Sequence, residues 1–164
     1  ALSMGSQLTV TGEAETRGTR YVVLPSGESV VAAHVSPLTD HLNDPVGIAS
    51  RLIDTPYLWG GRTAFGIDCS GLVQLAHAMC GNNLPRDSDM QRATVGKLIG
   101  EGTDHQPLQR GDLVFWKGHV AMMEDDANML HTSGHIMSTL REPLADAIRR
   151  IGYMYGPPLA YRRP

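Results

Sequence analysis

Apolar residues follow a helical period in four segments of this chain and form short β-rich runs between them. Spacings of three and four residues, bounded by punctuating residues such as Pro56 and Gly81, predict helices over 46–53, 69–80, 88–98 and 142–151. Runs rich in Val, Thr and aromatic residues, separated by Gly, Pro and Asp, predict strands over 7–11, 19–24, 29–33, 112–116, 119–123, 128–132, 136–140 and 159–162. No internal repeat accompanies this pattern.

The first forty residues differ from the rest because they carry only β-rich runs, broken by Gly and Pro. Three short strands form a sheet that is marginal on its own. Residues 37–45, which begin and end with Pro, are typical of a linker. We therefore expect a small β module over 1–40 and a main domain over 41–164.

A glycine-rich loop before residue 68 delivers Cys69 to the first turn of the second predicted helix. A thiol is a poor nucleophile until it ionises. A helix N-terminus carries about half a positive charge and unsatisfied N–H groups, which favour the thiolate. Cys69 also shares a helical face with Leu72, Val73 and Ala76, which is typical of a core residue. Its position alone therefore fits either a nucleophile or a buried cysteine.

Two histidines follow where a hairpin could bring them together. His119 opens one predicted strand, His131 lies in the next, and a short polar turn separates them. In an antiparallel pair the two imidazoles could lie side by side. A cysteine activated by one histidine, itself oriented by a second polar group, is the arrangement of a cysteine hydrolase. His131 would hold His119 in one tautomer, with the nearby His135 as the alternative.

Six segments of the chain resemble, in order, the successive motifs of the NlpC-type bacterial cell-wall peptidases. They begin at Pro56-Tyr57-Leu58-Trp59-Gly60-Gly61-Arg62 and continue through residues 68–73, 84–91, 111–115, 118–120 and 130–131. The match covers residues 45–162, and its spacing agrees with the family. One such motif alone is a weak signal, whereas six in register are a strong one.

The resemblance implies a compact papain-like α+β fold, with helices packed on an antiparallel sheet. It also implies hydrolysis of a peptide bond in peptidoglycan stem peptides, typically that between γ-D-glutamate and a diamino acid. It assigns Cys69 as nucleophile, His119 as base and His131 as the orienting residue. No cofactor is implied, and the expected partners are muropeptides.

The same resemblance gives substrate roles to Tyr57, Asp68 and Ser70, and the position of Trp59 gives it one as well. The Tyr57 hydroxyl would lie near the oxyanion and could donate to it alongside the backbone N–H of Cys69. Trp59, beside two glycines, would form a wall of the active site. Asp68 and Ser70 would help to hold the substrate. Plain packing remains an alternative for the two aromatic residues, and an N-cap role remains one for Asp68.

The strands of residues 1–40 resemble the last strands of a bacterial SH3-like barrel, a module that often precedes this peptidase type. Family members with such modules often favour short stem peptides with a free N-terminal L-Ala. We therefore expect a recycling-type specificity. The bacterial cytoplasm is the favoured location, and a periplasmic or secreted location stays open.

Composition and charge argue against several other classes. Charged residues make up 19% and apolar residues 41%, which is ordinary for a globular protein, and the net charge is −3. Basic residues occur only as pairs, so a nucleic-acid partner is not expected. No apolar stretch approaches the roughly 18 residues that a membrane span needs.

Neither a disulfide nor a metal site is expected. Eleven helical steps put Cys80 about 16 Å from Cys69, too far for a disulfide, so Cys80 is expected to be a small buried hydrophobe. Cys69, His119 and His131 are possible zinc ligands. Zinc ligands usually come in tight pairs such as Cys-x-x-Cys, which is absent.

Two other functions remain open. One is a non-catalytic wall-binding module that retains the fold. The intact Cys69, His119 and His131 argue against it, because a binder has no reason to keep all three. The other is a papain-like amidase or acyltransferase that uses the same three residues.

Overall fold

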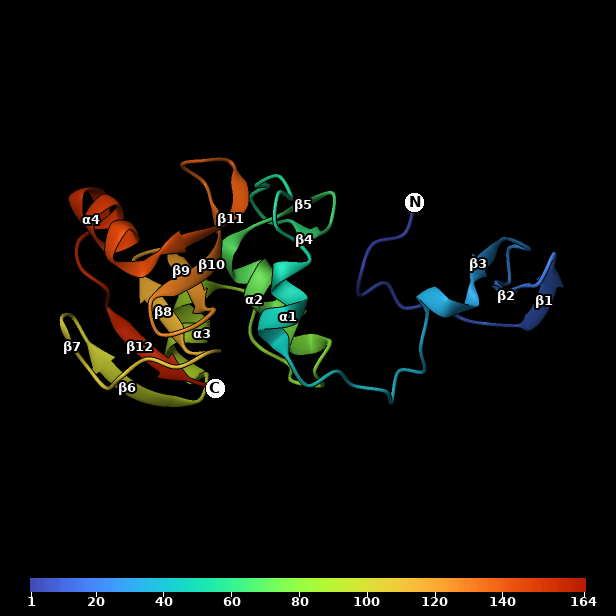
Figure 1. Ribbon diagram of the computed structural model, residues 1–164, viewed down its shortest axis with the longest axis horizontal. Coiled ribbons are helices and arrows are strands. Elements are labelled where there is room, and N and C mark those ends of the chain that lie inside the picture. The colour runs from blue at the N-terminus through green and yellow to red at the C-terminus, as the bar shows by residue number, and fades with distance from the viewer. The chain divides into compact units, whose positions relative to one another are not determined.

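The computed structural model describes residues 1–164 and divides into two compact units, Ala1–His41 and Leu42–Pro164 (Figure 1). The smaller unit is an antiparallel sheet in the order β1-β2-β3, followed by one turn of 3-10 helix. None of its residues is buried, so hydrophobic burial contributes little to its stability. It is a three-stranded sheet and not a closed barrel. Its elements are β1 (Gly12–Thr16), β2 (Thr19–Val23), β3 (Ser29–Val31) and η1 (Ala32–His34).

The first strand occupies 12–16, so the prediction of a strand over 7–11 was wrong. Arg17 and Gly18 both have positive φ, 51° and 77°, and form a tight turn that pairs Thr16 with Thr19. This turn fixes the register of the hairpin. Every residue of β1 is exposed, and its charged sequence lacks the apolar alternation on which the prediction relied.

The larger unit is built on a seven-stranded sheet in the order β11-β10-β9-β8-β12-β6-β7, with antiparallel neighbours. A separate two-stranded sheet, β4 (Arg62–Thr63) and β5 (Gly66–Ile67), precedes the second helix. The strands of the large sheet are β6 (Lys97–Glu101), β7 (Asp104–His105), β8 (Leu113–Trp116), β9 (His119–Met123), β10 (Asn128–Ser133), β11 (Ser138–Pro143) and β12 (Ala160–Arg163).

Four helices accompany this sheet: α1 (Pro45–Ser50), α2 (Cys69–Ala78), α3 (Ser88–Thr94) and α4 (Leu144–Tyr155). Helix α2 packs against β9 and β10, α1 packs on α2, and α4 contacts β11. Figure 1 shows α1 and α2 together and α4 at the β11 end of the sheet. The prediction of an α+β fold with an antiparallel sheet is confirmed. None of these helices is long and apolar enough to cross a membrane.

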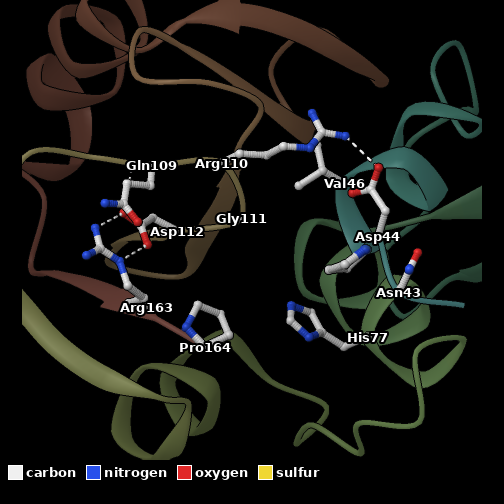
Figure 2. Close-up of a pocket in the computed structure, with 11 residues that line it drawn as sticks. Asn43, Asp44, Val46, His77, Gln109, Arg110, Gly111, Asp112, Arg163 and Pro164 are labelled. Carbon is white, nitrogen blue, oxygen red and sulfur yellow. Dashed lines mark hydrogen bonds and ion pairs between the residues drawn. The ribbon is translucent and has the colours of Figure 1, made fainter.

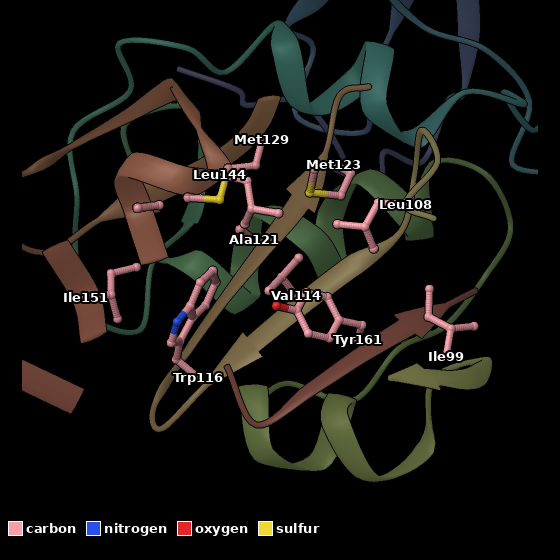
Figure 3. Packing of buried hydrophobic residues seen from close by; sticks show 11 residues of the cluster. Ile99, Leu108, Val114, Trp116, Ala121, Met123, Met129, Leu144, Ile151 and Tyr161 are labelled. Carbon is pink, nitrogen blue, oxygen red and sulfur yellow. The ribbon is translucent and has the colours of Figure 1, made fainter. Parts of the chain in front are cut away.

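The hydrophobic core uses both faces of the central strands. One set of alternating residues packs with α4 in a buried cluster (Figure 3), which includes Val114, Trp116, Ala121, Met123, Leu144 and Ile151. The residues between them on β8 and β9 are 0% exposed: Leu113, Phe115, Val120 and Met122. Burial of such a side chain contributes about 1.5–3 kcal/mol. Strand β9, which opens with His119, is therefore packed on both of its faces.

Helix α3 ends at Thr94, and the predicted continuation to Leu98 was wrong. Residues 97–101 instead form β6, which pairs with β12. At the turn, Gly96 has a φ of +50°, and a Cβ there would lie 2.0 Å from the carbonyl oxygen of Arg163. The apolar Leu98 and Ile99 fit either a helix or a strand by spacing, so pairing with β12 decided their conformation.

The last part of the chain is displaced by a few residues from its prediction. Strand β11 spans 138–143 and α4 spans 144–155, where a strand over 136–140 and a helix over 142–151 were expected. Pro143, at the N-cap of α4, ends the pairing with β10 at Asn128. The shift places Glu142 in a strand, which matters for the site described next.

Candidate active site

Cys69 is the first residue of α2, and the fold holds its backbone tightly. Asp68 caps the helix by accepting a hydrogen bond from the Gly71 N–H at 2.8 Å. The preceding loop packs closely against this turn, since a Cβ on Gly71 would lie 2.4 Å from the Gly61 carbonyl oxygen. Cys69 is 7% exposed and its thiol is free. The first turn of α2 therefore has little freedom to move the sulfur.

Opposing effects act on the Cys69 thiol. Burial raises its pKa, and the nearby Asp68 carboxylate raises it further. Hydrogen bonds from the backbone N–H groups of Val120, Ser70 and Cys69 lower it without reversing the net rise. The helix N-terminus thus favours the thiolate as expected, but burial outweighs it. A neighbouring base must accept the proton before the sulfur can attack.

His119, the candidate base, directly precedes Val120, whose N–H reaches the sulfur. Its Nε2 lies 2.9 Å from Nδ1 of His131, with the two rings edge to face. Burial lowers the pKa of His119 to about 3, and the positive charge of Arg150, together with that of His131 whenever His131 is protonated, adds to this effect. The imidazole is consequently neutral at neutral pH, with a free lone pair on one ring nitrogen, and burial also makes it a weaker base than an exposed histidine.

His131 is 1% exposed, and both of its ring nitrogens have partners. Nδ1 faces His119, while Nε2 lies 3.0 Å from Oε2 of Glu142 on β11. Arg150 of α4 in turn binds Glu142, with Nε 3.1 Å from Oε1. The hydrogen bond from His131 lowers the pKa of Glu142 to about 2, with Arg150 assisting and burial opposing. Glu142 is therefore ionised at neutral pH.

Asp68 lies beside the cysteine, and both of its carboxylate oxygens accept several hydrogen bonds. Arg86 binds both of its oxygens, Nη1 to Oδ1 at 2.9 Å and Nη2 to Oδ2 at 2.6 Å. Gly60 N–H donates to Oδ2 at 2.8 Å, and the hydroxyl of Ser70 lies between Asp68 and Arg86. Burial would raise the pKa of Asp68, but these hydrogen bonds outweigh it and the pKa lies below its usual value. The N-cap alternative for Asp68 is thus realised.

The two aromatic residues occupy different environments. Tyr57 packs on Gly134, where a Cβ would lie 3.4 Å from the ring. Burial and the charges of Cys69 and Asp68 raise the pKa of Tyr57, so its hydroxyl remains a donor at neutral pH. Trp59 is 85% exposed, which excludes a core-packing role for its indole.

The histidines are not arranged as a metal site. His131 and His135 stand four residues apart, a spacing that ligand pairs can use. In the structure, however, no group of three or more His, Cys, Asp or Glu side chains could hold a metal ion. His131 uses its nitrogens on His119 and Glu142 instead.

A cavity of about 500 Å³ lies elsewhere in the larger unit (Figure 2). Its charged side chains are paired within its own lining, Arg110 with Asp44 and Arg163 with Asp112. His77 also lines it, with a buried Nε2 that has no hydrogen-bond partner. None of the predicted site residues lines this cavity, so it is separate from the candidate site at Cys69.

Sequence reasoning missed three residues of the site. Arg86 belongs to a segment that carried the family resemblance, but its spacing from Cys69 gave no sign that the two are close. Glu142 and Arg150 were expected in one short helix. The signal for Glu142 would have been the β10–β11 register, which pairs Met129 with Glu142 and so sets the carboxylate diagonal to His131.

A buried cysteine at a helix start, next to a strand that carries one member of a histidine pair, is the arrangement of cysteine hydrolases. The model of the NlpC/P60 family matches residues 54–149, more than half of the chain. The chain belongs to the NlpC/P60 family.

Two bacterial proteins are similar to the chain over the same region. The chain is 35% identical over 102 residues to a gamma-D-glutamyl-L-lysine dipeptidyl-peptidase of Bacillus cereus, covering 57% of this chain and 29% of that protein. It is 32% identical over 112 residues to the probable endopeptidase NlpC of Escherichia coli, covering 59% and 70% respectively. The chain therefore spans less than a third of the Bacillus cereus relative.

A solved structure supports the fold over the whole chain. A crystal structure of an NlpC/P60 family protein from Bacillus cereus matches with a TM-score of 0.76 and 28% identity. The match covers 99% of this chain and 55% of that chain. The smaller N-terminal unit thus lies within the matched region.

Proposed function

We propose that this chain is a cysteine peptidase that hydrolyses the bond between γ-D-glutamate and a diamino acid in peptidoglycan stem peptides. The observation that carries the proposal is the position of Cys69 at the start of α2, against the strand that opens with His119, whose imidazole lies 2.9 Å from His131. The names of the similar Bacillus cereus and Escherichia coli proteins support the reaction class.

The reaction begins with transfer of the Cys69 thiol proton to His119. The thiolate then attacks the carbonyl carbon of the γ-D-glutamyl amide. The Cys69 N–H and the Tyr57 hydroxyl donate to the oxyanion. The C–N bond breaks as His119 protonates the leaving amine. Water, deprotonated by His119, hydrolyses the thioester and restores the thiol.

The substrate is held by residues around the same loop. Trp59, with its exposed indole, is proposed as a wall of the binding site, and Ser70, whose hydroxyl is bonded to Asp68 and Arg86, as a residue that helps to hold the peptide. Asp68 accepts hydrogen bonds from Gly60, Ser70, Gly71 and twice from Arg86. Asp68 therefore contributes to substrate binding indirectly, because it holds Ser70 and Arg86 in place.

The smaller unit is proposed to be part of an SH3-like module. Its three antiparallel strands and terminal 3-10 turn support this assignment. With it we propose a preference for short stem peptides that carry a free N-terminal L-Ala, and action in the cytoplasm where such peptides are recycled.

The test is mass spectrometry of products from three substrates: L-Ala-γ-D-Glu-L-Lys, L-Ala-γ-D-Glu-diaminopimelate and intact crosslinked sacculi. The proposal expects release of the free diamino acid from the two peptides. Cys69→Ala and His119→Ala should each lower kcat by about a thousandfold or more, whereas His131→Ala should cost less. Cys80→Ala, at the chain's other thiol, is the matched control and should keep full activity.

Other outcomes would separate the alternatives. Turnover by Cys69→Ala at the wild-type rate would refute the assignment of the nucleophile. Binding to sacculi without product would identify a wall-binding module. Transfer of the acyl group to an added amine in preference to water would identify an acyltransferase.

A further inference from the structure

Behind His119, a continuous line of polar contacts leads away from the cysteine. His131 joins His119 to Glu142, with contacts of 2.9 Å and 3.0 Å at its two nitrogens. Arg150 holds Glu142 at the far end through both carboxylate oxygens. The Glu142 side chain is 13% exposed and that of His131 is 1% exposed, so water competes little for these contacts.

The carboxylate fixes where the protons lie on both histidines. An ionised Glu142 can only accept, so His131 Nε2 must carry the proton of their hydrogen bond. A neutral imidazole has one N–H, which leaves Nδ1 of His131 as an acceptor. His119 must then donate from Nε2. The Nδ1 of His119 is left without a proton, and this is the nitrogen that can take one from Cys69.

The opposite arrangement would inactivate the base. If His131 carried its proton on Nδ1, it would donate to Nε2 of His119, and neutral His119 would hold its own proton on Nδ1. That nitrogen could then accept nothing from a thiol. The choice between the two states depends on whether the group facing His131 Nε2 is an acceptor or a donor.

We propose that Glu142, held in place by Arg150, is a positioning residue that selects the tautomers of His131 and His119 and offsets the charge that His119 gains. The inference rests on the proposed function, because a base at His119 has a purpose only if Cys69 reacts. When His119 accepts the thiol proton, the Glu142 carboxylate stabilises the resulting cation through His131. Glu142 thus acts through His131 and not on the reacting atoms.

An ion pair that only joined a strand to a helix would not require its carboxylate to contact a histidine as well. The neighbouring pair Glu124–Arg141 also joins a carboxylate to an arginine, and it involves no histidine. Glu142, in contrast, shares Oε2 between Arg150 and His131. Glu124 therefore offers a matched control for removal of a paired carboxylate close to the same sheet.

The test compares the full chain with Glu142→Gln and Glu124→Gln by ¹⁵N NMR of histidine-labelled protein at pH 7, together with kcat and KM. In the wild type, His131 and His119 should both show the Nε2–H tautomer. Glutamine can present its N–H₂ to His131, so Glu142→Gln should shift both rings toward Nδ1–H and lower kcat about 10–100-fold with KM unchanged. Glu124→Gln should change neither measurement.

Two results would overturn the inference: a wild-type His119 protonated on Nδ1, or a Glu142→Gln variant with wild-type tautomers and kcat. If Glu142→Gln fails to fold, the wild-type spectrum still decides, because it reports the tautomers without any variant. The spectrum also separates the two proposals. A chain with the expected tautomers that cleaves no muropeptide contradicts the proposed function and leaves the proton arrangement standing.

Discussion

Asp68 stands next to the candidate nucleophile, and its charge raises the pKa of the Cys69 thiol. Arg86 lies across the carboxylate with contacts of 2.9 Å and 2.6 Å, so an opposite charge is close by. The pair is largely enclosed, with side chains 27% and 10% exposed for Arg86 and Asp68. Because this ion pair is largely shielded from water, the charge of Arg86 is part of the electrostatic environment of the Cys69 sulfur.

Arg86→Ala should lower the free energy of unfolding by about 3–5 kcal/mol, because it leaves the Asp68 charge buried without its partner. Urea unfolding at pH 7 measures this loss. The control is Arg110→Ala, which removes an ion pair to Asp44 whose side chains are about half exposed. It should cost no more than about 1 kcal/mol. Equal losses in the two variants would show that Arg86 acts as a surface ion pair.

Helix α2 and the loop before it meet through glycine. Gly71 is in the first turn of α2, and a Cβ on it would clash with the Gly61 carbonyl oxygen at 2.4 Å. The Gly61 carbonyl is part of the backbone, so it cannot move aside as the end of a flexible side chain can. The contact therefore couples the loop that carries Tyr57 and Trp59 to the helix that carries Cys69.

Gly71→Ala should destabilise the protein by about 1–3 kcal/mol and lower kcat/KM, because either the loop or the first turn of α2 must move. Thermal unfolding and peptide hydrolysis measure the two effects. Gly152→Ala in α4 is the matched control, since nothing lies within 4 Å of the added Cβ. It should stabilise the helix by about 0.5–1 kcal/mol and leave kcat/KM unchanged. A Gly71→Ala variant as stable and active as wild type would contradict the close contact.

Patterning predicted some elements better than others. Strands β8, β9 and β10 and helix α2 begin within one residue of their predicted starts, because each is a buried segment whose apolar residues face the same core. Strand β1 and the strands β6 and β7 were missed. Their residues are largely exposed, so hydrophobic spacing carries little information about them, and pairing with a neighbouring strand decides their conformation.

Acid sensitivity is a property of the chain as a whole, because two groups linked through His131 have pKa values far from their ordinary values. The pKa of Glu142 falls from 4.5 to about 2, and that of His119 falls from 6.5 to about 3. In both cases the unfolded chain binds protons more readily than the folded one. The free energy of unfolding must therefore fall as the pH falls through these windows.

We expect the free energy of unfolding to decrease from pH 6.5 down to pH 2. The contribution of Glu142, up to about 3 kcal/mol, should be lost below pH 4.5. Glu142→Gln should be less stable than wild type at pH 7 and should lose less on acidification below pH 4.5. Denaturant unfolding across this pH range measures both slopes. Parallel curves for the two proteins would contradict the lowered pKa of Glu142.

Spacing and turn residues along the chain were enough to predict the helix that starts at the cysteine, the strands that carry two histidines, and the family to which the chain belongs. These features are local, because they depend on spacing and on turn residues within a few positions. Three features became visible in the folded chain alone: Arg86 pairs with Asp68, Glu142 reaches His131, and burial raises the pKa of the thiol. Each of these depends on segments far apart in the chain that pair or exclude water, and no local pattern records such contacts.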